Sequence, residues 1–228
     1  MATVAVPPRP TTWDCVTLED VAWGTYCALR DAEANDHVRM TYLDGSLTLM
    51  SPALRHDIPI GLLERLIQAV TAALDVEVMD IRTTTMRQAA PPGESRGAGK
   101  EADAAFYIGE SERRMRTRDE LDLSVDPPPD LAVEVDNSRD SATALAIYAR
   151  LGVPEVWRYR VDDRSVTIHR LDGGAYREVE RSGVLPVLTP ARILEALDRY
   201  AVGDLGQNAW SRWVEAWARG LAGPGGAG

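Results

Sequence analysis

Alternating hydrophobic and polar residues mark a hairpin in the first quarter of the chain. The alternation runs from His37 to Tyr42 and again from Ser46 to Met50. Asp44-Gly45 between them supplies the positive φ angles that a tight turn needs. The segment from Ile58 to Leu74 instead repeats its leucine, isoleucine and valine residues at helical spacing. The pattern therefore predicts two antiparallel strands followed by an amphipathic helix.

The same patterns predict the remaining elements of an α/β domain. Thr17-Leu-Glu-Asp20 resembles a capping box at the start of a helix that continues to about Ala34. Further strands are expected at 76–82, 101–108, 131–135 and 155–159, a helix at 142–151, and a second hairpin at 165–170 and 175–181. The proline- and glycine-rich stretch 88–99 is expected to be a mobile loop. Together these elements predict a mixed sheet flanked by helices.

The C-terminal part predicts one or two helices over 191–218, interrupted near Gly203 to Gly206. Trp210, Trp213 and Trp217 fall on one side of this segment, a pattern typical of a core or of a dimer seam. We therefore expect a domain over 12–185, a helical extension over 186–219 that helps to form a homodimer, and flexible termini at 1–11 and 220–228.

Composition limits the expected size of the domain and the cellular location of the protein. The chain has 228 residues, 45% of them hydrophobic, which is enough for one sizeable domain. No run of apolar residues is long enough to cross a membrane, and the first residues lack the order of a signal peptide. Cys15 and Cys27 match no zinc or redox motif and are expected to be free thiols. We expect a cytoplasmic protein.

Charge disfavours extensive nonspecific binding to nucleic acid. The formal net charge is −10, and the 25 basic residues are 24 arginines and the single Lys100. Arginine is concentrated only in the segment 111–120, where Arg113, Arg114, Arg116 and Arg118 are nearly balanced by acidic neighbours. We expect that segment to be a solvated loop.

Candidate chemistry begins with carboxylates inside predicted strands. Glu134 and Asp136 project from one face of a strand, and Glu101 and Asp103 share a face of another. If these strands are neighbours, several negative charges converge and call for a cation, and hard oxygen ligands select Mg²⁺ or Mn²⁺. The alternative is a structural ion network in which Asp103 and Glu134 pair with arginines such as Arg87 or Arg139.

Three separated motifs make the chain resemble a known family. They are Gly99-Lys-Glu-Ala-Asp-Ala-Ala-Phe-Tyr-Ile108, the segment Asp122 to Val135 that ends in Leu-Ala-Val-Glu-Val, and Ile147 to Trp157. Together with Tyr42 to Pro52 they resemble the Uma-two family of restriction endonucleases, within the PD-(D/E)XK nuclease superfamily. The resemblance implies a restriction-endonuclease-like fold, a mixed sheet flanked by helices, with a metal site where two central strands diverge.

The resemblance also implies roles for individual residues. Asp103 matches the motif aspartate and Glu134 the glutamate of E-X-K, and the Val135 carbonyl would be a further metal ligand. His56 and Asp57 match positions where the family often has His-Glu beside the site. Mg²⁺ held there would orient and acidify a water for attack on a phosphodiester.

One departure from the family pattern concerns the motif lysine. Asp136 occupies the lysine position of E-X-K, and the family's shifted lysine aligns with Ala144. Lys100 points away from Asp103 in a regular strand, so it could serve only if Gly97 to Gly99 bend the chain. Arg139 or Arg150 could replace it as a phosphate clamp.

Three functional hypotheses follow. The favoured one is Mg²⁺-dependent hydrolysis of DNA, with Asp103 and Glu134 on the metal, with Asp136, Glu101 or Asp57 as auxiliary ligands, and with an arginine such as Arg139 on the phosphate. The second is an inactive nuclease-fold protein that binds nucleic acid or a protein partner. The third is an interaction protein that uses the tryptophan stripe.

Overall fold

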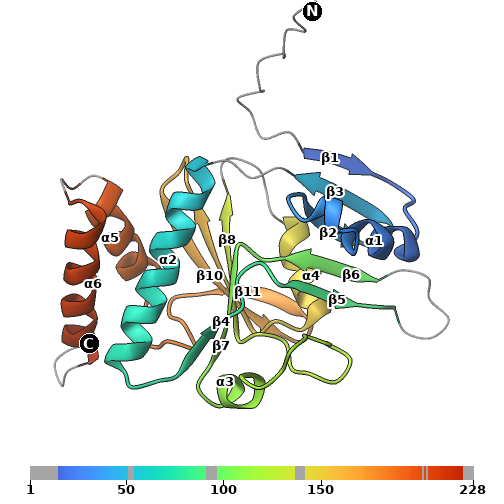
Figure 1. Cartoon of the computed structure of the whole chain (residues 1–228). Helices are drawn as coiled ribbons and strands as arrows, with labels where there is room; N and C mark the ends of the chain where they lie inside the picture. Colours follow the sequence, from blue (N-terminus) through green and yellow to red (C-terminus); the bar gives the residue numbers. More distant parts are fainter. Residues whose placement is uncertain are drawn as a thin grey trace, which may run out of the picture.

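Two β-sheets and six α-helices make up the described part of the chain, and residues 98–101 of the small sheet lead directly into residues 104–108 of the large sheet (Figure 1). The computed structural model describes residues 15–50, 54–90, 97–136, 142–201, 203 and 205–222. Predictions for residues 1–14, 51–53, 91–96, 137–141 and 223–228 concern residues outside the described part of the chain.

Sheet A is the smaller sheet and contains five antiparallel strands in the order β1-β3-β2-β6-β5. The predicted hairpin at its centre is confirmed, and Asp44 (φ 49°) and Gly45 (φ 102°) form its turn. The strands are β1 (Cys15–Leu18), β2 (Arg39–Leu43), β3 (Ser46–Met50), β5 (Thr85–Gln88) and β6 (Ala98–Glu101).

Sheet B has six strands in the order β11-β10-β9-β8-β7-β4. Its central pair, β8 and β9, is parallel and is joined through helix α4, whereas the other pairs are antiparallel, so the predicted mixed sheet is confirmed. The strands are β4 (Val78–Asp80), β7 (Ala104–Ile108), β8 (Leu131–Asp136), β9 (Glu155–Arg160), β10 (Ser165–Asp172) and β11 (Ala175–Val179).

The helices cover sheet B on both faces (Figure 1). On one face α2 packs with α5 and α6 around buried residues of β8, including Leu131 and Val133. On the other face α4 lies between the two sheets, with Ile147 and Tyr148 against Ala132. The α-helices are α1 (Trp23–Arg30), α2 (Leu54–Ala73), α3 (Glu110–Met115), α4 (Ala142–Leu151), α5 (Pro190–Ala201) and α6 (Gln207–Ala222), and η1 (Glu33–Asn35) is a 3-10 turn.

The predicted strand 101–108 is divided between the two sheets. β6 ends at Glu101 in sheet A and β7 begins at Ala104 in sheet B, so Ala102 and Asp103 form a bend between them. The apolar pattern could not reveal this division, because both halves are buried. In a continuous strand, side chains three residues apart point to opposite faces. The bend allows such side chains to lie on the same side of the chain.

The predicted capping box at Thr17 is wrong. Cys15–Leu18 is the edge strand β1, and the Thr17 hydroxyl is hydrogen-bonded to that of Thr48 at 3.0 Å. Asp20 has φ 55°, which ends the strand, and the helix begins only at Trp23. A threonine has a high strand propensity, and pairing with β3 outweighs the local helix signal.

The glycines before Lys100 allow close packing, so the expected mobile loop is wrong for the part that the structure describes. A Cβ atom at Gly99 would lie 2.6 Å from ring carbons of Tyr26, and one at Gly97 would lie 2.9 Å from Trp23. Trp23, Tyr26 and Tyr42 form an aromatic cluster with ring centroids 5.0 to 5.4 Å apart. The Tyr26 ring of α1 therefore requires glycine at position 99 of β6.

The C-terminal helices share the core of sheet B. Trp210 is buried and its indole N–H donates to the Ala196 carbonyl at 2.7 Å. Trp213 and Trp217 are half-buried and stacked at 5.7 Å. Residues 220–222, expected to be flexible, belong to α6, whereas the domain division at residue 185 stays a prediction.

Two smaller expectations have clear outcomes. The arginine segment is a helix up to Met115, and its Arg116 and Arg118 pair with Glu112 and Asp126 at 2.7 and 3.0 Å. Cys27 is a free thiol, as expected. Among the described helices, none is both long enough and apolar enough to cross a membrane.

Replacement of Gly99 by alanine should destabilise the fold. The added methyl group would overlap the buried Tyr26 ring, and overpacking of this kind costs about 1–3 kcal/mol of unfolding free energy. Urea denaturation of Gly99→Ala measures this loss. Gly24→Ala, in open space within α1, is the matched control and should be neutral or stabilising by up to about 1 kcal/mol. Equal effects of the two substitutions would contradict the close packing.

Candidate active site

Glu134 lies in the middle of β8 and faces α4, while its neighbours Val133 and Val135 face α2. Its side chain is 7% exposed, so its charge needs partners within the protein. The Tyr148 hydroxyl of α4 donates a hydrogen bond to Oε1. The Lys100 ammonium lies 3.1 Å from Oε2. Glu134 is thus held by one helix and by a strand of the other sheet.

Lys100 reaches Glu134 from the far side of the seam between the sheets. Its side chain is 8% exposed, and its ammonium lies 5.7 Å from the centre of the Tyr148 ring. From the sequence, Lys100 is expected to reach the site only if the glycines before it bend the chain. The bend instead follows it, at Ala102 and Asp103, and brings Lys100 and Asp103 to one site.

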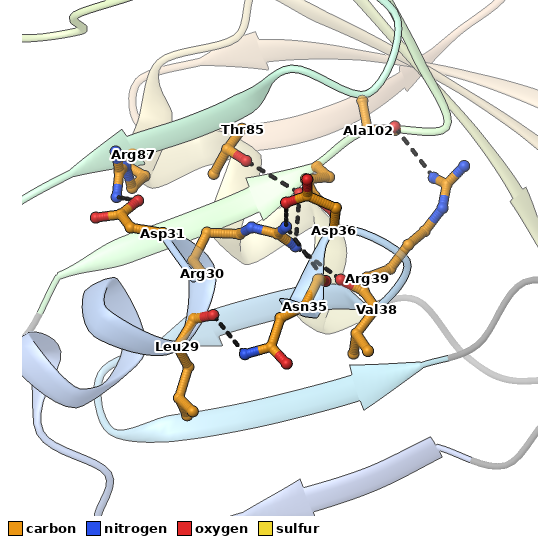
Figure 2. Close-up of polar contacts among 11 residues, drawn as sticks. Leu29, Arg30, Asp31, Asn35, Asp36, Val38, Arg39, Thr85, Arg87 and Ala102 are labelled. Atoms are coloured by element: carbon orange, nitrogen blue, oxygen red, sulfur yellow. Dashed lines mark hydrogen bonds and ion pairs between the residues drawn. The ribbon is translucent and has the colours of Figure 1, made fainter. Parts of the chain in front are cut away.

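Asp103 is held at the end of β8, beside Glu134. Its Oδ2 accepts a hydrogen bond from the Val135 amide at 2.8 Å, and its Oδ1 lies 2.8 Å from Nη1 of Arg39. Arg39 also donates to the Ala102 carbonyl at 3.3 Å (Figure 2). The register that pairs Ala104 with Val133 continues towards Asp103 and Glu134, so the two carboxylates converge.

Electrostatics of the cluster follow from its burial. Desolvation raises the pKa of Glu134 to about 7, although Lys100 acts in the opposite direction, and Asp103 adds to the rise. Burial opposes the charge on Lys100, but the carboxylates of Glu134 and Asp103 outweigh it and raise the pKa of the ammonium. Burial and Glu134 also raise the pKa of Tyr148, which therefore remains a hydrogen-bond donor.

The other expected carboxylates differ in their placement. Asp136 lies near the cluster, with its Oδ2 3.3 Å from Arg158 of β9. The Glu101 side chain instead faces α1, 3.0 Å from Arg30, and so lies on the opposite face of β6 from Lys100. The structure therefore brings Asp103, Glu134 and Asp136 together and separates Glu101 from them.

Asp57 and Asp103 line a common surface hollow of about 230 Å³. Asp57 is exposed in the first turn of α2. The hollow is lined by Arg39, Asp57, Ile60, Gly61, Glu64, Arg82, Thr83 and Asp103. Arg150 is an exposed residue of α4, whereas Arg139 and the His56 side chain lie outside the description.

Asp103 and Glu134 carry the hard oxygen donors that a divalent cation prefers. No group of three or more acidic, histidine or cysteine side chains capable of holding a metal occurs among the described residues. Mg²⁺, however, is commonly bound by one or two carboxylates, with water and substrate oxygens completing its shell. Asp103 and Glu134 would supply those two carboxylates and Val135 a carbonyl. In the structure these four carboxylate oxygens contact Arg39, the Val135 amide, Tyr148 and Lys100, so a bound cation would replace some of these contacts.

Sequence reasoning missed Arg39 and Tyr148. Tyr148 falls in a predicted helix within a family motif, but nothing local indicates that its hydroxyl reaches Glu134. Arg39 stands at the start of a predicted hairpin strand, and its contact with Asp103 depends on how the sheets meet. Arg87, a candidate partner for the acidic residues in the sequence pattern, pairs instead with Asp31 at 2.7 Å.

The mixed sheet flanked by helices is a restriction-endonuclease-like fold. The family model Uma2, described as "putative restriction endonuclease", matches residues 23–202. The chain belongs to the Uma2 family. The expected fold class is confirmed.

A solved structure is also similar to the chain. It is described as a "putative nuclease belonging to DUF820" from Anabaena variabilis and shares 13% sequence identity, with a TM-score of 0.44. The similarity covers 77% of this chain and 90% of that one. No curated protein matches the sequence.

Removal of the Lys100 ammonium should strongly destabilise the protein. Lys100→Met leaves Glu134 buried without its cation, which costs about 3–5 kcal/mol of unfolding free energy. The double variant Lys100→Met/Glu134→Gln should recover most of this loss, because the glutamine amide is neutral and its oxygen still accepts the Tyr148 hydrogen bond. Chemical denaturation measures both changes.

The control is an exposed ion pair of the same kind. Arg164 pairs with Asp198 on the surface, so Arg164→Ala should cost less than about 1 kcal/mol. A loss from Lys100→Met no larger than that from Arg164→Ala would contradict the buried pair.

Proposed function

We propose that the protein is an endonuclease that hydrolyses DNA phosphodiester bonds with Mg²⁺ or Mn²⁺. The observation that supports this most is the position of Lys100 beside Glu134. The sequence places aspartate where the family motif has lysine, and that departure by itself favours an inactive protein. An ammonium group from another strand now lies 3.1 Å from the motif glutamate.

Each residue would have a distinct task. Asp103, Glu134 and the Val135 carbonyl would hold the cation, which when bound supplies an acidified water and neutralises negative charge. Lys100 would donate hydrogen bonds to the attacking water and to a phosphoryl oxygen. Its raised pKa keeps the ammonium charged at neutral pH, as that role requires.

The neighbouring residues would hold this arrangement. Tyr148 would fix the orientation of Glu134, and Arg39 that of Asp103. Asp136 and Asp57 remain the auxiliary ligands that we propose, the first beside the cluster and the second in the hollow. Glu101 is left out of this set because it pairs with Arg30, and Arg139 stays a prediction.

A second candidate function rests on the fact that the charged groups of the cluster are paired with one another and with neighbouring protein groups. Each of the four carboxylate oxygens of Asp103 and Glu134 already has a protein partner: Arg39, the Val135 amide, Tyr148 and Lys100. A fully satisfied network of this kind suits a protein that keeps the nuclease fold but binds nucleic acid or a protein without cleavage.

Cleavage of plasmid DNA by the purified protein tests the proposal. With Mg²⁺ or Mn²⁺ we expect nicked and linear products, and EDTA should abolish them. Asp103→Asn, Glu134→Gln and Lys100→Met should each lower the rate by about 10²-fold or more. The first two would weaken binding of the cation, and the third would remove the ammonium that stabilises charge on the phosphate. Denaturation curves must show which variants remain folded under the assay conditions.

Arg113→Met is the matched control, because it removes an exposed positive charge from α3. Its rate should equal that of the original chain. Cleavage that persists in Asp103→Asn would indicate a contaminant and contradict the proposal. Retention of DNA in a mobility-shift assay, with no cleavage by the original chain, would favour the second function.

The homodimer belongs to the same proposal, with the seam at the half-buried Trp213 and Trp217 of α6. Arg199 lies 5.4 Å from the Trp213 ring centre and continues this surface. Light scattering should give twice the chain mass of 25.0 kDa, and Trp213→Ser/Trp217→Ser should reduce it to the mass of one chain. One chain mass for both proteins would exclude this dimer. A cytoplasmic location likewise stays a prediction.

A further inference from the structure

Arg30 and Glu101 form a second buried ion pair, next to the candidate site but on the other face of β6. Their side chains are 8% and 10% exposed, and their charged atoms lie 3.0 Å apart. Thr85 of β5 adds a hydrogen bond to Glu101 at 3.0 Å. The proposed reaction uses neither residue, so a buried pair at this position needs another explanation.

The strand that carries Lys100 has few features of its own to fix its register. β6 has only four residues, Ala-Gly-Lys-Glu, and glycine offers no side chain to pack. A shift by one residue would turn Glu101 towards Glu134 and Lys100 away from it. On the face of β6 opposite to Lys100, the side chain of Glu101 is the polar group that can fix the register.

Arg30 connects this strand to the one that carries Arg39. Its Nη1 donates to the Val38 carbonyl at 2.7 Å, and its Nη2 donates to the Asn35 carbonyl at 3.3 Å and lies 3.4 Å from Asp36 (Figure 2). Val38 directly precedes Arg39, which lies beside Asp103. The buried guanidinium of Arg30 therefore holds the backbone beside both cationic residues of the site, Lys100 and Arg39.

We propose that Arg30 and Glu101 are a positioning pair: by locking the register of β6, their ion pair directs Lys100 across the seam to Glu134. The pair touches neither carboxylate of the site and acts through Lys100. This inference deepens the proposed function, because it concerns the cation of the same site, but the placement of Lys100 can be measured without any cleavage.

Lys100 is the only lysine in the chain, which makes a direct measurement possible. In the folded protein its amine is buried, so an acetylating reagent should modify it slowly compared with the same lysine in the unfolded chain. Glu101→Gln removes the charge that Arg30 pairs with and nearly preserves the shape. We expect acetylation of Lys100, followed by mass spectrometry of its peptide, to become about tenfold faster.

Two controls separate positioning from general loosening. Asp31→Asn breaks the neighbouring Arg87 pair between α1 and β5, whose side chains are 38% and 59% exposed. Ile193→Val removes one methyl group from the buried core beneath α5. Neither should speed acetylation of Lys100 by more than about twofold, because exposed pairs and single methyl groups contribute little to local order.

A double variant protects the test against misfolding. Arg30→Met/Glu101→Met removes both charges, which a buried site tolerates better than the loss of one, and it should also expose Lys100. Unchanged acetylation in a folded Glu101→Gln or in the double variant would overturn the proposal. An equal increase in Asp31→Asn or Ile193→Val would overturn it as well.

The cleavage assay gives an independent readout. If the protein is a nuclease, Glu101→Gln should lower kcat by about tenfold or more with little change in KM, because Lys100 is displaced while the DNA surface is retained. Faster acetylation without any cleavage by the original chain would leave the positioning pair intact and reject only the nuclease function. A normal kcat together with faster acetylation would overturn the role of the pair in this site.

Discussion

The ion pair of Lys100 and Glu134 is the contact on which the proposed chemistry depends, because it joins the two sheets at the point where their charges meet. Sheet B and the bend beside it supply the carboxylates of Asp103, Glu134 and Asp136. Sheet A supplies Lys100 from β6 and Arg39 from β2. The site is therefore a property of the seam between the sheets, since Glu134 on one sheet has its nearest cation, Lys100, on the other.

This division explains features that otherwise look unrelated. Gly99 in β6 lets the Tyr26 ring of α1 approach, and the bend at Ala102 and Asp103 carries the chain from one sheet to the other within two residues. Tyr148 fills the space between the sheets with its ring while its hydroxyl holds Glu134. Packing and electrostatics thus impose the same arrangement, which is typical of sites built on rigid elements.

Much of the fold could be predicted from local sequence, because hairpins and amphipathic helices have short-range patterns. The turn at Asp44-Gly45 and helix α2 are examples. Convergence of Asp103 and Glu134 could be predicted from strand alternation and family resemblance. The position of Lys100 could not, because it depends on a bend inside an apparently uniform apolar run. Thr17 misled for a related reason: pairing with a distant strand determined its structure.

The two-residue link between β6 and β7 affects how the protein unfolds. Asp103 stands on that link, so the chain cannot part the sheets there without moving it. Heating that loosens only sheet A would separate ammonium from carboxylate while both sheets still keep most of their backbone hydrogen bonds. In such a molecule the chemistry would disappear at a lower temperature than the secondary structure.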